Sequence, residues 1–171
     1  MLKLVGAVIT VTAFGLTGMT IARKYREYPN QLRLIRSGLQ MLETEIVYAS
    51  SPMPEALEIV GRRIEEPIGD LFLTVASMMT KRKLSLREAW ENGLEELRAK
   101  SLLEAVDIDI LRVFGHGLGM SDVAEQVKNL HLVQEQLSNQ ELKAREKRDK
   151  GEKLWHALGF LLGLAVVLIL Y

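Results

Sequence analysis

Three histidines and one glycine-rich stretch are the residues of this chain whose types could carry chemistry. His116, His131 and His156 are scattered, and none has a second histidine or a cysteine at the spacing of metal ligands. The stretch Gly-His-Gly-Leu-Gly at 115–119 lacks the Gly-Lys-Ser/Thr ending that would bring a lysine and a hydroxyl to a phosphate and Mg²⁺. We therefore expect the histidines on helix surfaces and the glycine stretch in a turn between helices.

Carboxylates are abundant, but their spacing is typical of helix surfaces. Glu91, Glu95 and Arg98 recur at intervals of three and four residues, as on a solvated helix face. The chain contains no cysteine, which excludes disulfides, cysteine zinc sites and thiol nucleophiles. We find no catalytic, cofactor-binding or metal-binding set, and we predict that the protein is not an enzyme and needs no cofactor.

Three acidic residues, Glu55, Glu88 and Asp122, stand at predicted helix starts. Ser85 with Glu88, and Asp122 with Glu125, have the capping-box pattern. Negative charge near a helix N-terminus is favourable, so solvated capping is one interpretation. A second is that the three gather at one end of a bundle and contact a basic surface of a partner protein. Their intervals would also suit a tetratricopeptide array, but the signature positions of that repeat are not met.

The elements that must position these residues are helices. Region 28–142 is rich in Leu, Glu, Ala, Lys and Arg and lacks the alternation of strands. A stripe at helical spacing marks the buried face of its first helix; it comprises Leu32, Ile35, Leu39, Leu42, Ile46 and Ala49. Pro29 is expected to end the preceding helix. The six predicted helices cover residues 31–49, 54–64, 67–80, 86–99, 103–114 and 123 onward, the last running through Gly151 into the C-terminal segment.

Both ends of the chain are apolar: residues 4–22 and 154–171 contain no Asp, Glu, Lys or Arg. Roughly 20 apolar residues cross a membrane as a helix. We predict a transmembrane helix at 4–22, a soluble helical bundle at 28–142, a basic juxtamembrane segment at 143–153 and a second transmembrane helix at 154–171. The alternatives are two buried core helices, or a first segment cleaved as a signal peptide. Its cleavage site is poor, and its positive charge follows the apolar run.

Positive charge flanks both predicted spans on the side of the bundle. Arg23, Lys24 and Arg26 follow the first span and six basic residues in 143–153 precede the second, whereas only Lys3 lies on the other side. The positive-inside rule then predicts a cytoplasmic bundle. We expect segment 143–153 to contact anionic lipid headgroups. Basic and acidic residues are equal at 22 each, which argues against a nucleic-acid partner.

One motif in the second predicted span could promote the packing of helices in a membrane. Gly159 and Gly163 are four residues apart, so they lie on one side of a helix and allow another helix to approach closely. Gly18 and Ala22 in the first predicted span have the same four-residue spacing of small residues. Glycine is also common in membrane helices generally. We predict helix packing through Gly159 and Gly163, either with the other span or with another membrane protein.

The chain resembles a known family in three stretches and in its predicted plan of two terminal spans around a helical domain. The three stretches are Met-Leu-Lys-Leu-Val-Gly-Ala at 1–7, Tyr-Pro-Asn-Gln-Leu-Arg at 28–33 and Leu-Gln-Met-Leu-Glu-Thr-Glu-Ile at 39–46. On these stretches the whole chain resembles the stage III sporulation protein AB family of endospore-forming bacteria. The central region is also similar to the cytoplasmic domain of the type II secretion inner-membrane platform protein, through residues 51–59, 84–89 and 117–123.

The family resemblance implies a non-enzymatic membrane scaffold of the channel between mother cell and forespore. Such a protein would lie in the mother-cell membrane of a sporulating bacterium, beside other channel membrane proteins. The platform likeness implies contact with a secretion-type ATPase on the cytoplasmic side. The platform protein carries two such helical repeats and this chain carries one, so a role that needs both implies a homo-oligomer. A membrane-tethered helical adaptor of another signalling or secretion pathway is the alternative function.

Overall fold

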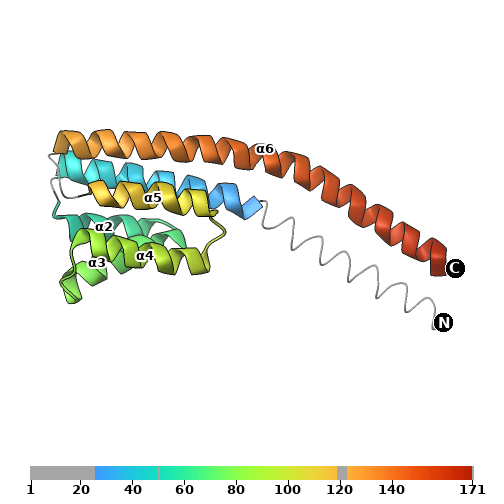
Figure 1. Cartoon of the computed structure of the whole chain (residues 1–171), viewed down its shortest axis with the longest axis horizontal. Coiled ribbons are helices and arrows are strands. Elements are labelled where there is room, and N and C mark those ends of the chain that lie inside the picture. Colours follow the sequence, from blue (N-terminus) through green and yellow to red (C-terminus); the bar gives the residue numbers. More distant parts are fainter. Residues whose placement is uncertain (1–25, 50, 119–122, 171) are drawn as a thin grey trace. The chain divides into compact units, whose positions relative to one another are not determined.

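The structure, a computed structural model, describes residues 26–49, 51–118 and 123–170, and at 123, 150 and 152–170 it describes the backbone alone. Every regular element in these ranges is a helix (Figure 1). Residues 26–44 are helical and lead into the π-helix η1, Glu45–Ala49. The α-helices that follow are α2 (Met53–Arg63), α3 (Ile68–Lys81), α4 (Leu86–Lys100), α5 (Ala105–Gly117) and α6 (Val123–Leu170). The prediction of an all-helical fold with about six helices is therefore confirmed for the described residues.

Among the described residues, no helix combines the length and the apolar composition that crossing a membrane requires. The first predicted span, 4–22, lies outside those residues, and so do the side chains of the second, 154–171. Helix α6 continues without a break through Gly151 to Leu170, as predicted.

The chain divides into two compact units. One is Asn30–Leu142, which we call the bundle. The other consists of the two chain ends, Met1–Pro29 and Lys143–Tyr171. In the described part of that second unit, Arg148 pairs with the neighbouring Asp149, with 2.9 Å between nitrogen and oxygen.

Consecutive helices of the bundle run in alternating directions (Figure 1). Gly61 of α2 lies against Leu73 of α3. The rings of Phe72 in α3 and Trp90 in α4 are 6.2 Å apart between centroids. Trp90 in turn lies against Gly115 of α5. Each of the helices α3 to α5 thus packs against the helix before it.

The 26–44 helix and α6 form a second antiparallel pair. Arg36 Nη1 lies 2.6 Å from Glu141 Oε2. About two turns further along the first helix, Glu43 Oε2 accepts a hydrogen bond of 3.1 Å from Gln134. The residue numbers rise on one helix while they fall on the other, so the two helices run in opposite directions.

The two ends of the bundle therefore hold different parts of the chain. Residues 30 and 142, where the chain enters and leaves the bundle, lie at one end, which we call the terminal end. The side-chain oxygen of Gln31 accepts the backbone N–H of Leu102 at 2.8 Å, so the connection from α4 to α5 lies at this end too. Because the helices alternate in direction, the starts of α2 and α4 lie at the opposite end, which we call the turn end (Figure 1).

The core follows the predicted helix faces. The buried stripe on the 26–44 helix consists of Leu32, Ile35, Leu39 and Leu42, all fully buried. Its predicted continuation is not buried: Ile46 is half-buried and Ala49 is exposed. The chain becomes a π-helix at Glu45, and the wider turn of a π-helix rotates the following side chains away from the stripe.

Two predicted helix ends are wrong. Residues 26–44 are helical throughout, so the described helix runs through Pro29 and does not begin after it. Proline has a φ near −65°, which fits a helix, and lacks only the N–H donor. Gly115 and Gly117 also lie within α5 and not in a turn. At Gly115 the reason is packing, because the indole of Trp90 occupies the place of a side chain.

Candidate functional site

The histidines do not come together in the described part of the chain. His116 is exposed in the last turn of α5. His131 is exposed on α6, with Nε2 2.8 Å from Glu43 Oε1. The side chain of His156 lies outside the described residues. Within the described ranges, no group of three His, Cys, Asp or Glu residues is placed to hold a metal ion.

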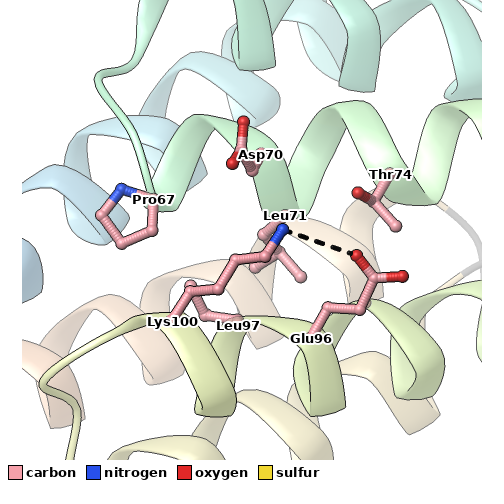
Figure 2. Close-up of a pocket in the computed structure, with 8 residues that line it drawn as sticks. Pro67, Asp70, Leu71, Thr74, Glu96, Leu97 and Lys100 are labelled. Atoms are coloured by element: carbon pink, nitrogen blue, oxygen red, sulfur yellow. Dashed lines mark ion pairs between the residues drawn. The ribbon is translucent and has the colours of Figure 1, made fainter.

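A shallow pocket lies between α3 and α4 (Figure 2). It is lined by Pro67, Asp70, Leu71, Thr74, Gly93, Glu96, Leu97 and Lys100. Figure 2 shows the side chain of Lys100 directed toward that of Glu96, and the two charged groups are 4.0 Å apart. The space holds about one water molecule, whereas ligand pockets usually measure roughly 300–1,000 Å³. This pocket is therefore too small for a metabolite or a nucleotide.

The densest charge cluster of the described residues joins α4 to α5. Arg112 donates hydrogen bonds to Glu91 at 2.7 Å, to Glu95 at 3.2 Å and to Asp109 at 2.7 Å. The hydrogen bond to Glu91 raises the pKa of the Arg112 guanidinium further above its ordinary value. Glu95 and Arg98 are exposed and Glu91 is partly exposed, as predicted for a solvated face, and the two carboxylates also bind Arg112 of α5. The cluster ties two helices together and leaves no group free for catalysis.

Of the three acidic helix starts, two lie in the described part of the chain, and both are at the turn end. Glu55 is exposed in the first turn of α2. The Glu88 carboxylate accepts the Ser85 hydroxyl at 2.7 Å and its backbone N–H at 3.1 Å, which confirms the predicted capping box. These hydrogen bonds lower the pKa of Glu88. Asp122 lies outside the described residues. Glu88 is thus engaged within its own helix, whereas Glu55 is open to solvent.

The C-terminal part of α6 holds two further sequence predictions. In the basic segment 143–153, Lys143, Arg145 and Lys147 are exposed. The predicted helix-packing pair, Gly159 and Gly163, lies where the structure describes the backbone alone, so the packing prediction falls outside the described side chains.

The sequence reasoning missed a cluster of cations at the turn end. Lys81, Arg82, Lys83 and Arg87 end α3, form the connection and begin α4, and we call these four residues the basic turn. All four are exposed, and none belongs to an ion pair among the described residues. The signal in the sequence is the run Lys-Arg-Lys at 81–83, which Leu84 separates from the capping box at Ser85 and which therefore lies close to a connection between two helices.

Comparisons with known proteins agree on one family. The model of the family described as "Stage III sporulation protein AB" matches residues 3–171. The stage III sporulation protein AB of Bacillus subtilis (strain 168) is 35% identical over 170 residues, which cover 99% of this chain and 99% of that protein. A solved structure of stage III sporulation protein AB superposes with a TM-score of 0.68 at 29% identity, over 72% of this chain and 98% of that one.

Proposed function

The chain belongs to the stage III sporulation protein AB family, and on that premise we propose that it is a non-enzymatic membrane scaffold of the channel between mother cell and forespore. In this proposal residues 4–22 and 154–171 span the mother-cell membrane and the bundle lies in the cytoplasm. The bundle acts by binding other proteins, which include membrane components of the channel.

One observation carries the membrane part of the proposal. The ion pair between Arg36 and Glu141 and the hydrogen bond between Glu43 and Gln134 hold the 26–44 helix and α6 antiparallel. The chain therefore enters and leaves the bundle at the same end, and each apolar segment lies beyond that point in the sequence. In the proposal the two spans would cross the membrane side by side as a hairpin, with the bundle attached at its terminal end. The turn end would then be free to bind partners.

A secretion-type ATPase in the cytoplasm is the partner we propose for the turn end. Glu55 is exposed there, and Asp122 precedes α6 in the sequence. The double variant Glu55→Lys with Asp122→Lys should weaken binding of the purified ATPase to the full chain in nanodiscs. Glu65→Lys is the matched control, because Glu65 is exposed in the connection between α2 and α3 at the terminal end. Equal ATPase binding by the wild-type protein and the double variant would remove these residues from the interface.

The assignment to sporulation is tested by deleting the gene in its own host. We expect cells without the gene to grow normally but to fail in spore formation after stage III, and a second copy of the gene to restore spores. Normal spore counts in the deletion strain would contradict the proposed function and favour an adaptor role in another pathway.

Lipid contact and self-association complete the proposal. The exposed cations of segment 143–153 would contact anionic headgroups, since such juxtamembrane clusters are attracted to the cytoplasmic membrane surface. A homo-oligomer would supply the second helical repeat that the type II platform protein carries in one chain. The mass of the full chain in nanodiscs, measured by native mass spectrometry, distinguishes one copy from several.

A further inference from the structure

We propose that the basic turn is a docking site for a carboxylate-rich segment of a partner protein. The four cations, Lys81, Arg82, Lys83 and Arg87, form the interaction surface. The inference rests on the proposed function in two respects, which are the side of the membrane on which the partner lies and the attachment of the proposed spans at the terminal end.

The four cations belong to no ion pair among the described residues. Elsewhere on the bundle, Arg62 pairs with Glu58 at 2.6 Å and Arg112 binds three carboxylates, whereas Arg63 and Arg98 are exposed singly and likewise have no ion pair in the described part of the chain. The carboxylate closest in sequence to the basic turn is Glu88, and its hydrogen bonds to Ser85 hold it in the helix cap. Four cations within seven residues therefore keep an excess of positive charge that repels itself and attracts a polyanion.

Helix stability does not account for the whole cluster of cations. Cations in the last turn of a helix interact favourably with the partial negative charge of its carboxyl end, which suits Lys81 at the end of α3. Arg87 is in the first turn of α4, where the same effect disfavours a cation. The position of Arg87 therefore needs a reason outside its own helix.

Hydrogen bonds hold the backbone of the turn in one conformation. The N–H groups of Arg82 and Leu84 both donate to the carbonyl of Met78, at 3.1 and 3.4 Å. Lys83 between them has a φ of 53°, the left-handed conformation that glycine adopts far more readily than lysine. A cation thus occupies the position where a glycine would be less strained. A preorganised turn loses less entropy when it binds a partner.

The place of the turn favours a protein over a lipid surface. The turn is at the end of the bundle opposite to residues 30 and 142. The 14 residues of α3 correspond to about 21 Å at 1.5 Å per residue. Attraction between exposed charges fades over a Debye length of about 8 Å at physiological salt. Headgroups near the terminal end would therefore exert little attraction on the turn.

The test measures binding at the turn itself, using the full chain in phosphatidylcholine nanodiscs. The protein has no cysteine, so Thr80→Cys gives a single attachment point for an environment-sensitive dye beside the basic turn. A deca-glutamate peptide is the probe. The test variant is Lys81→Gln, Arg82→Gln, Lys83→Gln and Arg87→Gln combined. The control removes the same charge from four exposed cations at the terminal ends of α2 and α4, which are Arg62, Arg63, Arg98 and Lys100.

We expect saturable binding that weakens about tenfold or more in the basic-turn variant and less than about threefold in the control, because several charge-assisted contacts are lost only in the first. Equal affinities of the two variants, or no response of the dye, would overturn the inference. A variant-sensitive response that is stronger to phosphatidylglycerol vesicles or to single-stranded RNA than to the peptide would also overturn it. An external location of the bundle would contradict the proposed function but leave this binding result unchanged.

Discussion

The indole of Trp90 lies where the side-chain carbon of a larger residue at position 115 would be, directly against Gly115. Its Nε1 donates a hydrogen bond of 2.9 Å to the carbonyl of Leu111. The ring also packs edge-on against Phe72, at 6.2 Å between centroids, and against Phe114, at 5.5 Å. One buried side chain thereby joins α3, α4 and α5, and glycine at 115 is what gives it room.

Gly115→Ala should lower the free energy of unfolding by about 1–3 kcal/mol, because the new methyl group forces the indole out of its position. Gly117→Ala is the matched control in the same helix. The nearest atom to its new carbon is the side-chain nitrogen of Asn129 at 3.1 Å, which can move, and alanine is the better helix former. Urea unfolding followed by circular dichroism measures both variants. Equal stability of the two variants would contradict the packing account.

The pair Arg36–Glu141 holds the 26–44 helix against α6. Glu141 is almost fully buried, whereas Arg36 is partly exposed. Water therefore reaches the guanidinium but not the carboxylate. Glu141→Gln should lower the free energy of unfolding by about 1–3 kcal/mol, since it leaves a partly buried guanidinium without its charged partner. The control Glu135→Gln changes an exposed residue of the same helix and should stay within about 0.5 kcal/mol. A Glu141→Gln protein as stable as the control would show that the pair does not hold these helices.

The Ser85–Glu88 capping box predicts a pH dependence with a defined sign. The pKa of Glu88 is lowered in the folded protein from its ordinary value of 4.5, mainly by the hydrogen bond from the Ser85 hydroxyl. The stabilisation is therefore fully present above pH 4.5 and is lost as the pH falls through the lower folded pKa. We expect Glu88→Gln to be less stable than wild type at pH 7 and the difference to shrink below pH 4.5. A difference that is constant from pH 7 to pH 3 would contradict this account.

The glycines of the predicted second span give a prediction about assembly. Gly159→Leu combined with Gly163→Leu should reduce spore formation and the recovery of channel membrane proteins with the tagged chain, because leucine prevents close helix approach. Leu161→Ile keeps the volume of its residue and should have little effect. If the double leucine variant assembles as well as the control, the two glycines do not form a packing surface.

Helix existence was predictable because the apolar stripe and the helix-breaking residues agree along most of the bundle. Leu32, Ile35 and Leu39 recur at helical spacing and are fully buried. Ser85 and Glu88 predict a helix start, because a capping box depends only on local hydrogen bonds. The residues that make up each signal are only three or four positions apart in the sequence, so each signal can be recognised without knowledge of the tertiary fold.

The errors arise where a distant part of the chain decides the outcome. Gly115 has the local signature of a turn, but its role depends on Trp90, twenty-five residues away in the sequence. Glu91 is partly exposed and Glu95 is exposed, as their spacing predicts, but their contact with Arg112 of the next helix depends on the tertiary fold and was not predicted. The basic turn was not predicted although the run Lys-Arg-Lys at 81–83 is visible in the sequence, because only the folded structure shows that these cations belong to no ion pair among the described residues.

The account depends most on a cytoplasmic bundle between two membrane spans, and thiol labelling tests this directly. The chain has no cysteine of its own, so Arg63→Cys on the exposed end of α2 and Lys3→Cys at the N-terminus give two clean single sites. Sporulating cells carrying each variant are treated with a membrane-impermeant thiol reagent, before and after permeabilisation. We predict that Arg63→Cys reacts only after permeabilisation and that Lys3→Cys reacts in intact cells. Reaction of Arg63→Cys in intact cells would place the bundle outside the cytoplasm and contradict the proposed contact with an ATPase.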